Sequence, residues 1–596
     1  MALWLKTGEQ VTLVRYWEFE RYSGQKHHSR SFANPAQALE VIDRLLAEAG
    51  VDRSDVRAIF GTPGLPHSDG AWDGADDLNA HTRAHLFGAM LAETDRYFEG
   101  DMIGLALDGG PDTVLGKPGL KSPLYAGAVS RKGDARLFSV SSPAPLWSAA
   151  RHLTGMEEGS LMALGSASRT AYMGSVEDAP SVIAMQDYKA AYEWVQRLHA
   201  TLSGLDSSAK GTGHTGFDPQ FSASENRIAM LMKIIQRVSE AQVCRTVRGI
   251  LESEGMDPAK TTLAMGGGFA LNCRSNSHVM RTFGFADFQA LPAVNDGGIS
   301  LGYGLMYFKA RMERFQFSMQ SSGHGSLASV ETASAPVRTD VILEDLAKGP
   351  IVWMEGRAEI GPRALGHRSL LADPRQDTMK DRLNQIKRRQ WWRPVAPVIL
   401  ADQVREWFSD ADRSPFMLRT FTLRPEKAAR VPAISHLDRS ARIQTLTREE
   451  APLLYDLLQA FHASTGVPML CNTSLNDKGE PIINVLEEAL IFARRRGLPA
   501  VYVDGRRHAV VADAVRDTTV LSERSIAPLF RSAPAEIARL RAEVNPHGLD
   551  RNTLAMRQFL PAFEGVDITV RTSAERLRRY AARLARNGVQ AWSLMQ

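Results

Sequence analysis

The stretch GRAEIGPRALGHRSLLADPR, residues 356–375, sets arginines beside glycines and prolines. An arginine presents a rigid fork of N–H donors that matches phosphate and carboxylate groups, and glycine lets the backbone approach a ligand closely. These residue types predict an anion-binding site. A surface loop of solvated arginines is the alternative that the stretch alone leaves open.

More cations and polar side chains follow in NQIKRRQWWRPVAPVIL, SARIQTL and CNTSLNDKGEPI. The cations that join the candidate site are Arg363, Lys387, Arg393 and Arg442. If residues 472–476 are extended, side chains alternate with period two, so Asn472, Ser474 and Asn476 share one side. Amides and a hydroxyl beside cations predict binding of a phosphate attached to an amide-like group.

A second set of residues has the spacing of metal ligands. His81 and His85 in NAHTRAHLFGAM are four apart, which puts both imidazoles on one face of a helix. Asp108 in LALDGG and Asp296 in AVNDGG each precede Gly-Gly and could supply carboxylate ligands. Imidazole and oxygen ligands suit Fe(II), Mn(II) or Zn(II). Structural histidines and ordinary Asp-Gly turns are the alternative.

The glycine triplet in MGGGFALNC, residues 265–273, lies between a strand-like run and a candidate helix. Backbone N–H groups there could hold a phosphate, and the start of a helix would add a favourable dipole. The triplet matches neither G-x-G-x-x-G nor G-x-x-x-x-G-K-[ST], which argues against Rossmann and P-loop proteins.

These residues need elements that bring them together. Strand-like runs closing on glycine or aspartate, as in DMIGLALDGG, TTLAMGGGFALN, PIVWMEGR and AVYVDGRR, alternate with helical patterns such as AMLMKIIQRVSEAQVCRTVRGILESEG. This alternation predicts an α/β fold with ligands at the carboxyl ends of the strands.

The bulk properties bound the organisation of the chain. Its 596 residues are too many for one core, so several domains are expected, and a net charge of +4 gives no hint of nucleic-acid binding. The 3 cysteines are isolated, which argues against a disulfide framework or a cysteine zinc site. Without an apolar run of about 18 residues or a secretory leader, we expect a cytoplasmic protein with no membrane span.

Composition also suggests where the domains end. Residues 316–340 are rich in Ser, Ala and Gly and are typical of a linker. We expect one domain over residues 1–325, a second over 338–520, and a C-terminal helical extension over 521–596. The basic amphipathic helices of that extension are expected to pack on the surface, with membrane or RNA binding as the less favoured reading.

The motifs together resemble the NodU/CmcH type of O-carbamoyltransferase, which includes enzymes that modify antibiotics and nodulation factors. The match runs in order over roughly residues 10–515, through HTRAH, MGGGFALNCRSN, VNDGGISLG, GRAEIGPRALGHRSLLADPR, NQIKRRQWWRPVAP, ARIQT and TGVPMLCNTSLNDKGEPI. The resemblance implies a first domain similar to the threonylcarbamoyl-transferase fold of the actin-like ATPase (ASKHA) class. The second domain would be similar to a YrdC-type α/β domain.

The resemblance also implies a reaction and a set of site residues. Carbamoyl phosphate and ATP with Mg would give carbamoyl-adenylate, and the carbamoyl group would pass to a hydroxyl of a secondary metabolite or sugar at an Fe(II) site, with Mn or Zn as alternatives. The metal site would comprise His81, His85, Asp108 and Asp296, with His81 and Asp108 also catalytic. The adenylate would be held by Gly266, Gly267, Gly268 and Asn272, and the phosphates by Arg363, Lys387, Arg393, Arg442 and Ser474 with Asn472 and Asn476 beside them. Lys26 and His27 would line the acceptor pocket and take part in catalysis.

The chain departs from the family pattern at several positions. Ser160 stands where a lysine is common, His367 where asparagine is usual and Lys478 where arginine is frequent. In the family a His-Asp pair precedes the segment at which this chain starts. The partners expected are a small-molecule hydroxyl acceptor and, as an option, a second copy in a homodimer, with no nucleic acid and no membrane. The rival functions are a tRNA threonylcarbamoyl-modifying enzyme and a catalytically impaired nucleotide-binding scaffold.

Overall fold

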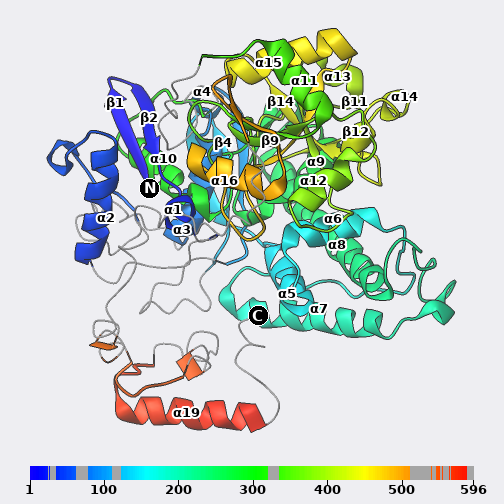
Figure 1. Ribbon diagram of the computed structural model, residues 1–596. Coiled ribbons are helices and arrows are strands. Elements are labelled where there is room, and N and C mark those ends of the chain that lie inside the picture. The colour runs from blue at the N-terminus through cyan, green and yellow to red at the C-terminus, as the bar shows by residue number, and fades with distance from the viewer. Residues whose placement is uncertain are drawn as a thin grey trace.

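The computed structural model describes residues 1–24, 26, 35–61, 78–110, 123–319 and 335–510, and part of the C-terminal segment (538, 539, 542, 545–550, 553, 554, 563 and 566–586). It is a mixed α/β structure with two larger sheets (Figure 1). No helix in the described ranges has both the length and the apolar character needed to cross a membrane.

The first large sheet has the strand order β5-β4-β3-β6-β7. Its strands are β3 (Asp101–Ala106), β4 (Ala126–Arg131), β5 (Asp134–Ser139), β6 (Thr261–Gly266) and β7 (Asp287–Gln289). β3 runs parallel to β6 with Ala106 paired to Gly266, whereas β4 is antiparallel to both of its neighbours. The carboxyl ends of β3 and β6 therefore meet at one edge, which places Asp108 beside the glycine triplet. The strands predicted in DMIGLALDGG and TTLAMGGGFALN are confirmed.

Helices cover this sheet, and the chain begins with the hairpin of β1 (Ala2–Thr7) and β2 (Gln10–Tyr16). The helices of this half are α1 (Phe19–Ser23), α2 (Pro35–Glu48), α3 (Ala80–Met90), α4 (Thr94–Glu99), α5 (Ala144–Thr154), α6 (Glu158–Ala167), α7 (Tyr188–Ser203), α8 (Ala223–Glu254), α9 (Cys273–Phe283) and α10 (Ile299–Lys309). α8 begins at a capping box of Ser222 with Glu225 and ends at Gly255, so the helix predicted from its apolar periodicity is confirmed.

The second large sheet has the order β14-β10-β15-β9-β8-β16-β17 and mixes parallel and antiparallel pairs. Its strands are β8 (Ile351–Met354), β9 (Arg368–Ala372), β10 (Ala396–Leu400), β14 (Gln444–Leu446), β15 (Met469–Ser474), β16 (Ala500–Val503) and β17 (Arg506–Ala509). A smaller sheet holds β11 (Phe408–Ser409), β12 (Thr420–Leu423) and β13 (Ser440–Arg442). The helices are α11 (Thr339–Lys348), α12 (Met379–Ile386), α13 (Val404–Trp407), α14 (Pro425–Ala428), α15 (Pro452–Thr465) and α16 (Leu486–Arg496).

The two halves of the chain pack against each other. The apolar core around the first sheet takes in Ile360, Leu365 and Ala396 from the second half, while the second sheet has a core of its own. Asn276 of α9 donates a hydrogen bond to Leu418 O at 2.8 Å, and Thr420 N donates one to Ser277 Oγ at 2.8 Å. The α/β class is thus confirmed, whereas the actin-like and YrdC-like assignments stay predictions.

Residues 320–334 and most of 511–596 lie outside the described residues, so the domain limits at 325, 338 and 520 also stay predictions. In the C-terminal segment α19 (Arg571–Arg586) forms where a basic helix was expected. Its apolar side packs on Leu549, Phe563 and Ile568.

Candidate functional site

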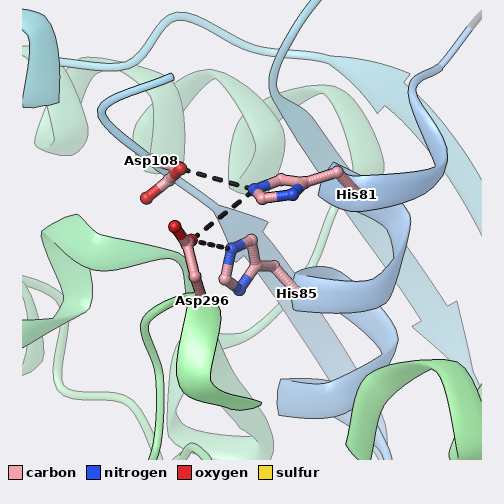
Figure 2. A group of neighbouring side chains, drawn as sticks. All are labelled: His81, His85, Asp108 and Asp296. Carbon is pink, nitrogen blue, oxygen red and sulfur yellow. Dashed lines mark ion pairs between the residues drawn. The ribbon is translucent and has the colours of Figure 1, made fainter. Parts of the chain in front are cut away.

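Four predicted metal ligands converge at the edge where β3 and β6 end (Figure 2). One ligand atom from each of His81, His85, Asp108 and Asp296 lies within 4.8 Å of all the others. His81 Nε2 is 3.5 Å from Asp108 Oδ2, and His85 Nε2 is 3.4 Å from Asp296 Oδ1. The side chains of the histidines are 4% and 3% exposed, whereas that of Asp296 is 68% exposed, so the cluster opens to solvent on the Asp296 side.

Local packing fixes this arrangement. The Asn79 side chain caps α3 by accepting a hydrogen bond from His81 N at 2.8 Å, and both histidines then project from one face of the helix. α3 lies against α10 so closely that a Cβ on Gly302 would be 2.0 Å from Ala84 O. α10 follows directly after the short turn Asp296–Gly298, and the contact with α3 therefore brings Asp296 to the histidines.

Asp108 is held by the glycine triplet. Gly268 N donates to Asp108 Oδ1 at 2.7 Å. Burial alone would raise the pKa of Asp108, but the neighbouring His81 and His85 and the hydrogen bond from Gly268 N together lower it well below its usual range. Asp108 is therefore a carboxylate at neutral pH.

The donor set fits a divalent transition metal. Bonds of roughly 2.0–2.2 Å to one ion place neighbouring ligand atoms about 3–4 Å apart, and the 3.5 Å between His81 and Asp108 and the 3.4 Å between His85 and Asp296 fall in that range. Nε2 of His85 is buried and makes no hydrogen bond within the described part of the chain, which leaves its lone pair for an ion. Two imidazoles and two carboxylates are ligand types that Fe(II), Mn(II) and Zn(II) all accept.

A cluster of cations lies in the second half, and we call it the cation cluster. Its members are Arg363, Lys387, Arg389, Arg393 and Arg442. They come from the loop between β8 and β9, the segment after α12, and β13. None of them forms an ion pair with a carboxylate among the residues that the structure describes.

Electrostatics in this cluster favour an incoming anion. Burial first, and then the charge of Arg442, lower the pKa of both Arg363 and Arg393. Burial and the charge of Arg389 lower the pKa of Lys387 well below its usual range. Nε of Arg363 and Nε of Arg442 are buried and lack a hydrogen-bond acceptor in the described ranges. A phosphate would supply both the charge and the acceptors that these groups lack.

Of the polar row predicted over residues 472–476, Asn472 and Ser474 lie on β15, which ends at Ser474, and Asn476 lies just beyond it. Lys387 Nζ donates to Ser474 O at 2.5 Å and to the side chain of Asn476, and Ser474 Oγ donates to Asn476 Oδ1 at 2.7 Å. Asn472 instead donates to Ala364 O at 3.1 Å and to Gln444 Oε1 at 2.9 Å, and so supports the loop that carries Arg363. Binding of a ligand by Asn472, Ser474 and Asn476 stays a prediction.

One segment of the first half reaches from the metal cluster to the cation cluster. Gly267 has a φ of +86°, which brings the chain across the end of β3. Asn272 then caps α9 by accepting from Ser275 N at 3.1 Å, and Cys273 in the first turn of α9 lies near Arg363 and Arg442. Adenylate binding by Gly266, Gly267, Gly268 and Asn272 stays a prediction.

The N-terminal segment also touches both regions. The Tyr16 hydroxyl donates to Gly297 O, next to Asp296. Arg21 is 3% exposed, pairs with Glu18 at 2.6 Å and donates through Nη2 to Gly361 O at 2.9 Å, in the loop of Arg363.

The structure thus brings the predicted metal ligands together and gathers the predicted cations in one place. Lys26 lies at 3.4 Å from Glu157 and acts electrostatically on Lys387, so it is near the cation cluster, while its role in acceptor binding stays a prediction. His27 lies outside the described residues.

The cations identified from sequence did not include Arg389, although it stands in the same KRRQWWR run. The sequence reading also missed Tyr188, whose hydroxyl donates to Gly109 O at 2.5 Å beside Asp108.

The second half of the chain is similar to known proteins. Residues 343–508 match the family described as "Carbamoyltransferase C-terminus". The nodulation protein NolNO of Sinorhizobium fredii is 36% identical over 249 residues, 38% of this chain and 37% of that protein. NolO of Bradyrhizobium diazoefficiens is 34% identical over 277 residues, covering 43% and 50%. The 3'-hydroxymethylcephem-O-carbamoyltransferase of Amycolatopsis lactamdurans is 35% identical over 254 residues, covering 41% and 48%. The chain therefore spans half or less of the length of each of these relatives.

Proposed function

We propose that the chain is an ATP-dependent O-carbamoyltransferase of the NodU/CmcH type, which the match of residues 343–508 to the carbamoyltransferase C-terminus and the similarity to NolNO and the cephem O-carbamoyltransferase support. Carbamoyl phosphate, ATP and water would give carbamoyl-adenylate, phosphate and pyrophosphate. An acceptor hydroxyl would then bond to the carbamoyl carbon while the bond from that carbon to the adenylate oxygen breaks. AMP leaves, and the hydroxyl proton is lost to water.

The observation that carries this proposal is the cation cluster inside the matched domain. Its positive charges have no paired carboxylate among the described residues, although burial makes each of them costly to keep charged. The two substrates, carbamoyl phosphate and ATP, are both anions and repel each other. Several fixed guanidinium groups offset that repulsion and hold the reacting groups in place.

The residues of the first half suit the transfer step. A metal bound by His81, His85, Asp108 and Asp296 would supply Lewis-acid polarisation of the carbamoyl carbonyl or the acceptor hydroxyl. The capped helix α3 orients both imidazoles, and Gly268 N keeps Asp108 ionised and in place. Burial of the histidines excludes water on one side, while the exposed Asp296 leaves the other side open for an acceptor.

We propose a small-molecule hydroxyl as acceptor, on a secondary metabolite or sugar. The name of the Amycolatopsis relative indicates a hydroxymethyl group on a cephem, which supports this class.

The experiment separates the two half-reactions. Arg442→Ala should release no pyrophosphate from ATP and carbamoyl phosphate, yet should transfer the carbamoyl group from supplied carbamoyl-adenylate. His81→Ala should release pyrophosphate but give no carbamoyl mass gain on the acceptor. Loss of both activities in both variants would contradict the division of labour, and wild-type enzyme that releases no pyrophosphate would refute the proposed function.

A further inference from the structure

Ser160 connects α6 of the first half to the cation cluster of the second. Its side chain is buried, with the residue 5% exposed, and Arg393 Nη1 donates to Ser160 Oγ at 2.6 Å. Ser160 Oγ in turn lies 3.5 Å from Gln390 Oε1, a weak second contact. The guanidinium lies over the first turn of α6, since a Cβ on the neighbouring Gly159 would be in ordinary van der Waals contact with Arg393 Nη2 at 3.7 Å.

The residue before Arg393 is anchored on the same helix. Trp392 is buried among Ala163, Leu164 and Ala167 of α6, and its ring is 6.0 Å from that of Phe221. The backbone is also held, since Asn384 Nδ2 donates to Arg393 O at 2.9 Å. α6 therefore fixes the Arg393 main chain through Trp392 and its guanidinium through Ser160.

The hydrogen bond from Arg393 to Ser160 offsets electrostatic repulsion within the cation cluster. The charge of Arg442 repels Arg393 more strongly than the charge of Glu157 attracts it, so the long side chain needs a partner that keeps it in the cluster. A fixed acceptor holds the guanidinium in the cluster before any anion arrives, so less order has to be gained on binding. Among the five cations, Arg393 alone has a hydrogen bond to residues 123–319 in the described part of the chain.

We infer that Ser160 is a positioning residue that aims Arg393 at the bound phosphate. The inference rests on the proposed function for the existence of the anion site, and adds that the site is complete only when α6 is docked on the second half. A serine hydroxyl, small enough to sit under the guanidinium and able to accept its hydrogen bond, meets this need.

The test measures binding of inorganic phosphate to the full chain by titration calorimetry. Ser160→Ala should weaken phosphate binding about tenfold, because one hydrogen bond to a charged group is lost. Ser160→Thr keeps the hydroxyl and should restore binding. In a double-mutant cycle, Ser160→Ala combined with Arg393→Ala should be no weaker than Arg393→Ala alone, because Ser160 acts only through Arg393.

Ser166 offers a matched control on the same helix. Ser166 Oγ also accepts from an arginine, Arg274 Nη1 at 2.5 Å, but that arginine is outside the cation cluster. Ser166→Ala should bind phosphate as the wild type does.

Wild-type affinity in Ser160→Ala, an equal loss in Ser160→Thr, or additive losses in the cycle would each overturn the positioning role while leaving the anion site standing. Absence of phosphate binding by the wild type would instead refute the anion site itself. If Ser160→Ala does not fold, as judged by circular dichroism, Ser160→Cys replaces it in the same cycle, since it keeps the volume with a poorer acceptor.

Discussion

His367, the last residue of the loop between β8 and β9 that carries Arg363, should make the stability of the protein depend on pH. It is 6% exposed, and its Nδ1 lies 2.9 Å from Glu355 O. Burial lowers the pKa of His367 from 6.5 to about 4, because a charged imidazole would lose its hydration, with the Arg368 charge acting in the same direction. The folded state therefore holds His367 neutral at pH values where the unfolded chain protonates it.

The sign and size follow from proton linkage. A depressed pKa contributes stability that is present above pH 6.5 and is lost as the pH falls toward 4. Each pKa unit corresponds to about 1.4 kcal/mol, so the full loss is about 3 kcal/mol, with about 2 kcal/mol gone by pH 5. The buried Glu355 opposes this trend, because burial raises its pKa to about 7 and its cost disappears as it is protonated.

Comparison with His367→Asn isolates the histidine, since Glu355 is common to both proteins. The measurement is urea denaturation followed by circular dichroism between pH 7.5 and 4.5. The free energy of unfolding of the wild type should fall relative to that of His367→Asn by about 2 kcal/mol at pH 5. His152→Asn, at an exposed position, serves as control and should track the wild type. A constant difference between wild type and His367→Asn across this range would refute the reasoning.

Three further predictions concern the two clusters. His85→Ala should lower the metal content of the purified protein and its affinity for added Fe(II), measured by plasma mass spectrometry and titration, because one of four ligands is lost; unchanged metal content would speak against the site. Trp392→Ala should destabilise the protein by about 3–5 kcal/mol and weaken phosphate binding, because it leaves a cavity where the indole packs on α6. A loss of stability under about 1 kcal/mol, the size expected for one buried methylene, would contradict the anchoring role. Gly267→Ala should abolish the metal site or the fold, because the residue has a φ of +86° and the added Cβ would lie 2.2 Å from Leu107 O; a metal-replete, stable variant would show that the turn tolerates a side chain.

Most of the candidate metal cluster could be predicted from sequence because His81, His85 and Asp108 depend on local structure, whereas the place of Asp296 depends on how α10 packs on α3. Four-residue spacing on a helix joins His81 to His85, and strand ends place Asp108 where parallel neighbours meet. The contacts between the two halves could not be predicted from the sequence, because they depend on how α6 packs against the second half. Ser160 appeared only as a departure from the family lysine, and Trp392 only as part of a basic motif. The alternation of side chains along β15 predicted the side of the strand on which Asn472 lies, but not its hydrogen bonds to Ala364 O and Gln444 Oε1.

The buried Arg21 has a consequence for how the chain comes apart. Its guanidinium pairs with Glu18 and donates to Gly361 O, so the first residues of the chain are tied into the loop that carries Arg363. Pulling the halves apart would break this hydrogen bond to Gly361 O and would expose Ile360, Leu365 and Ala396, which belong to the apolar core of the first sheet. The two halves should therefore melt as a single cooperative unit with one calorimetric transition, and a hinge that opens between turnovers would have to pivot around the contact of Arg21 with Gly361 rather than through it.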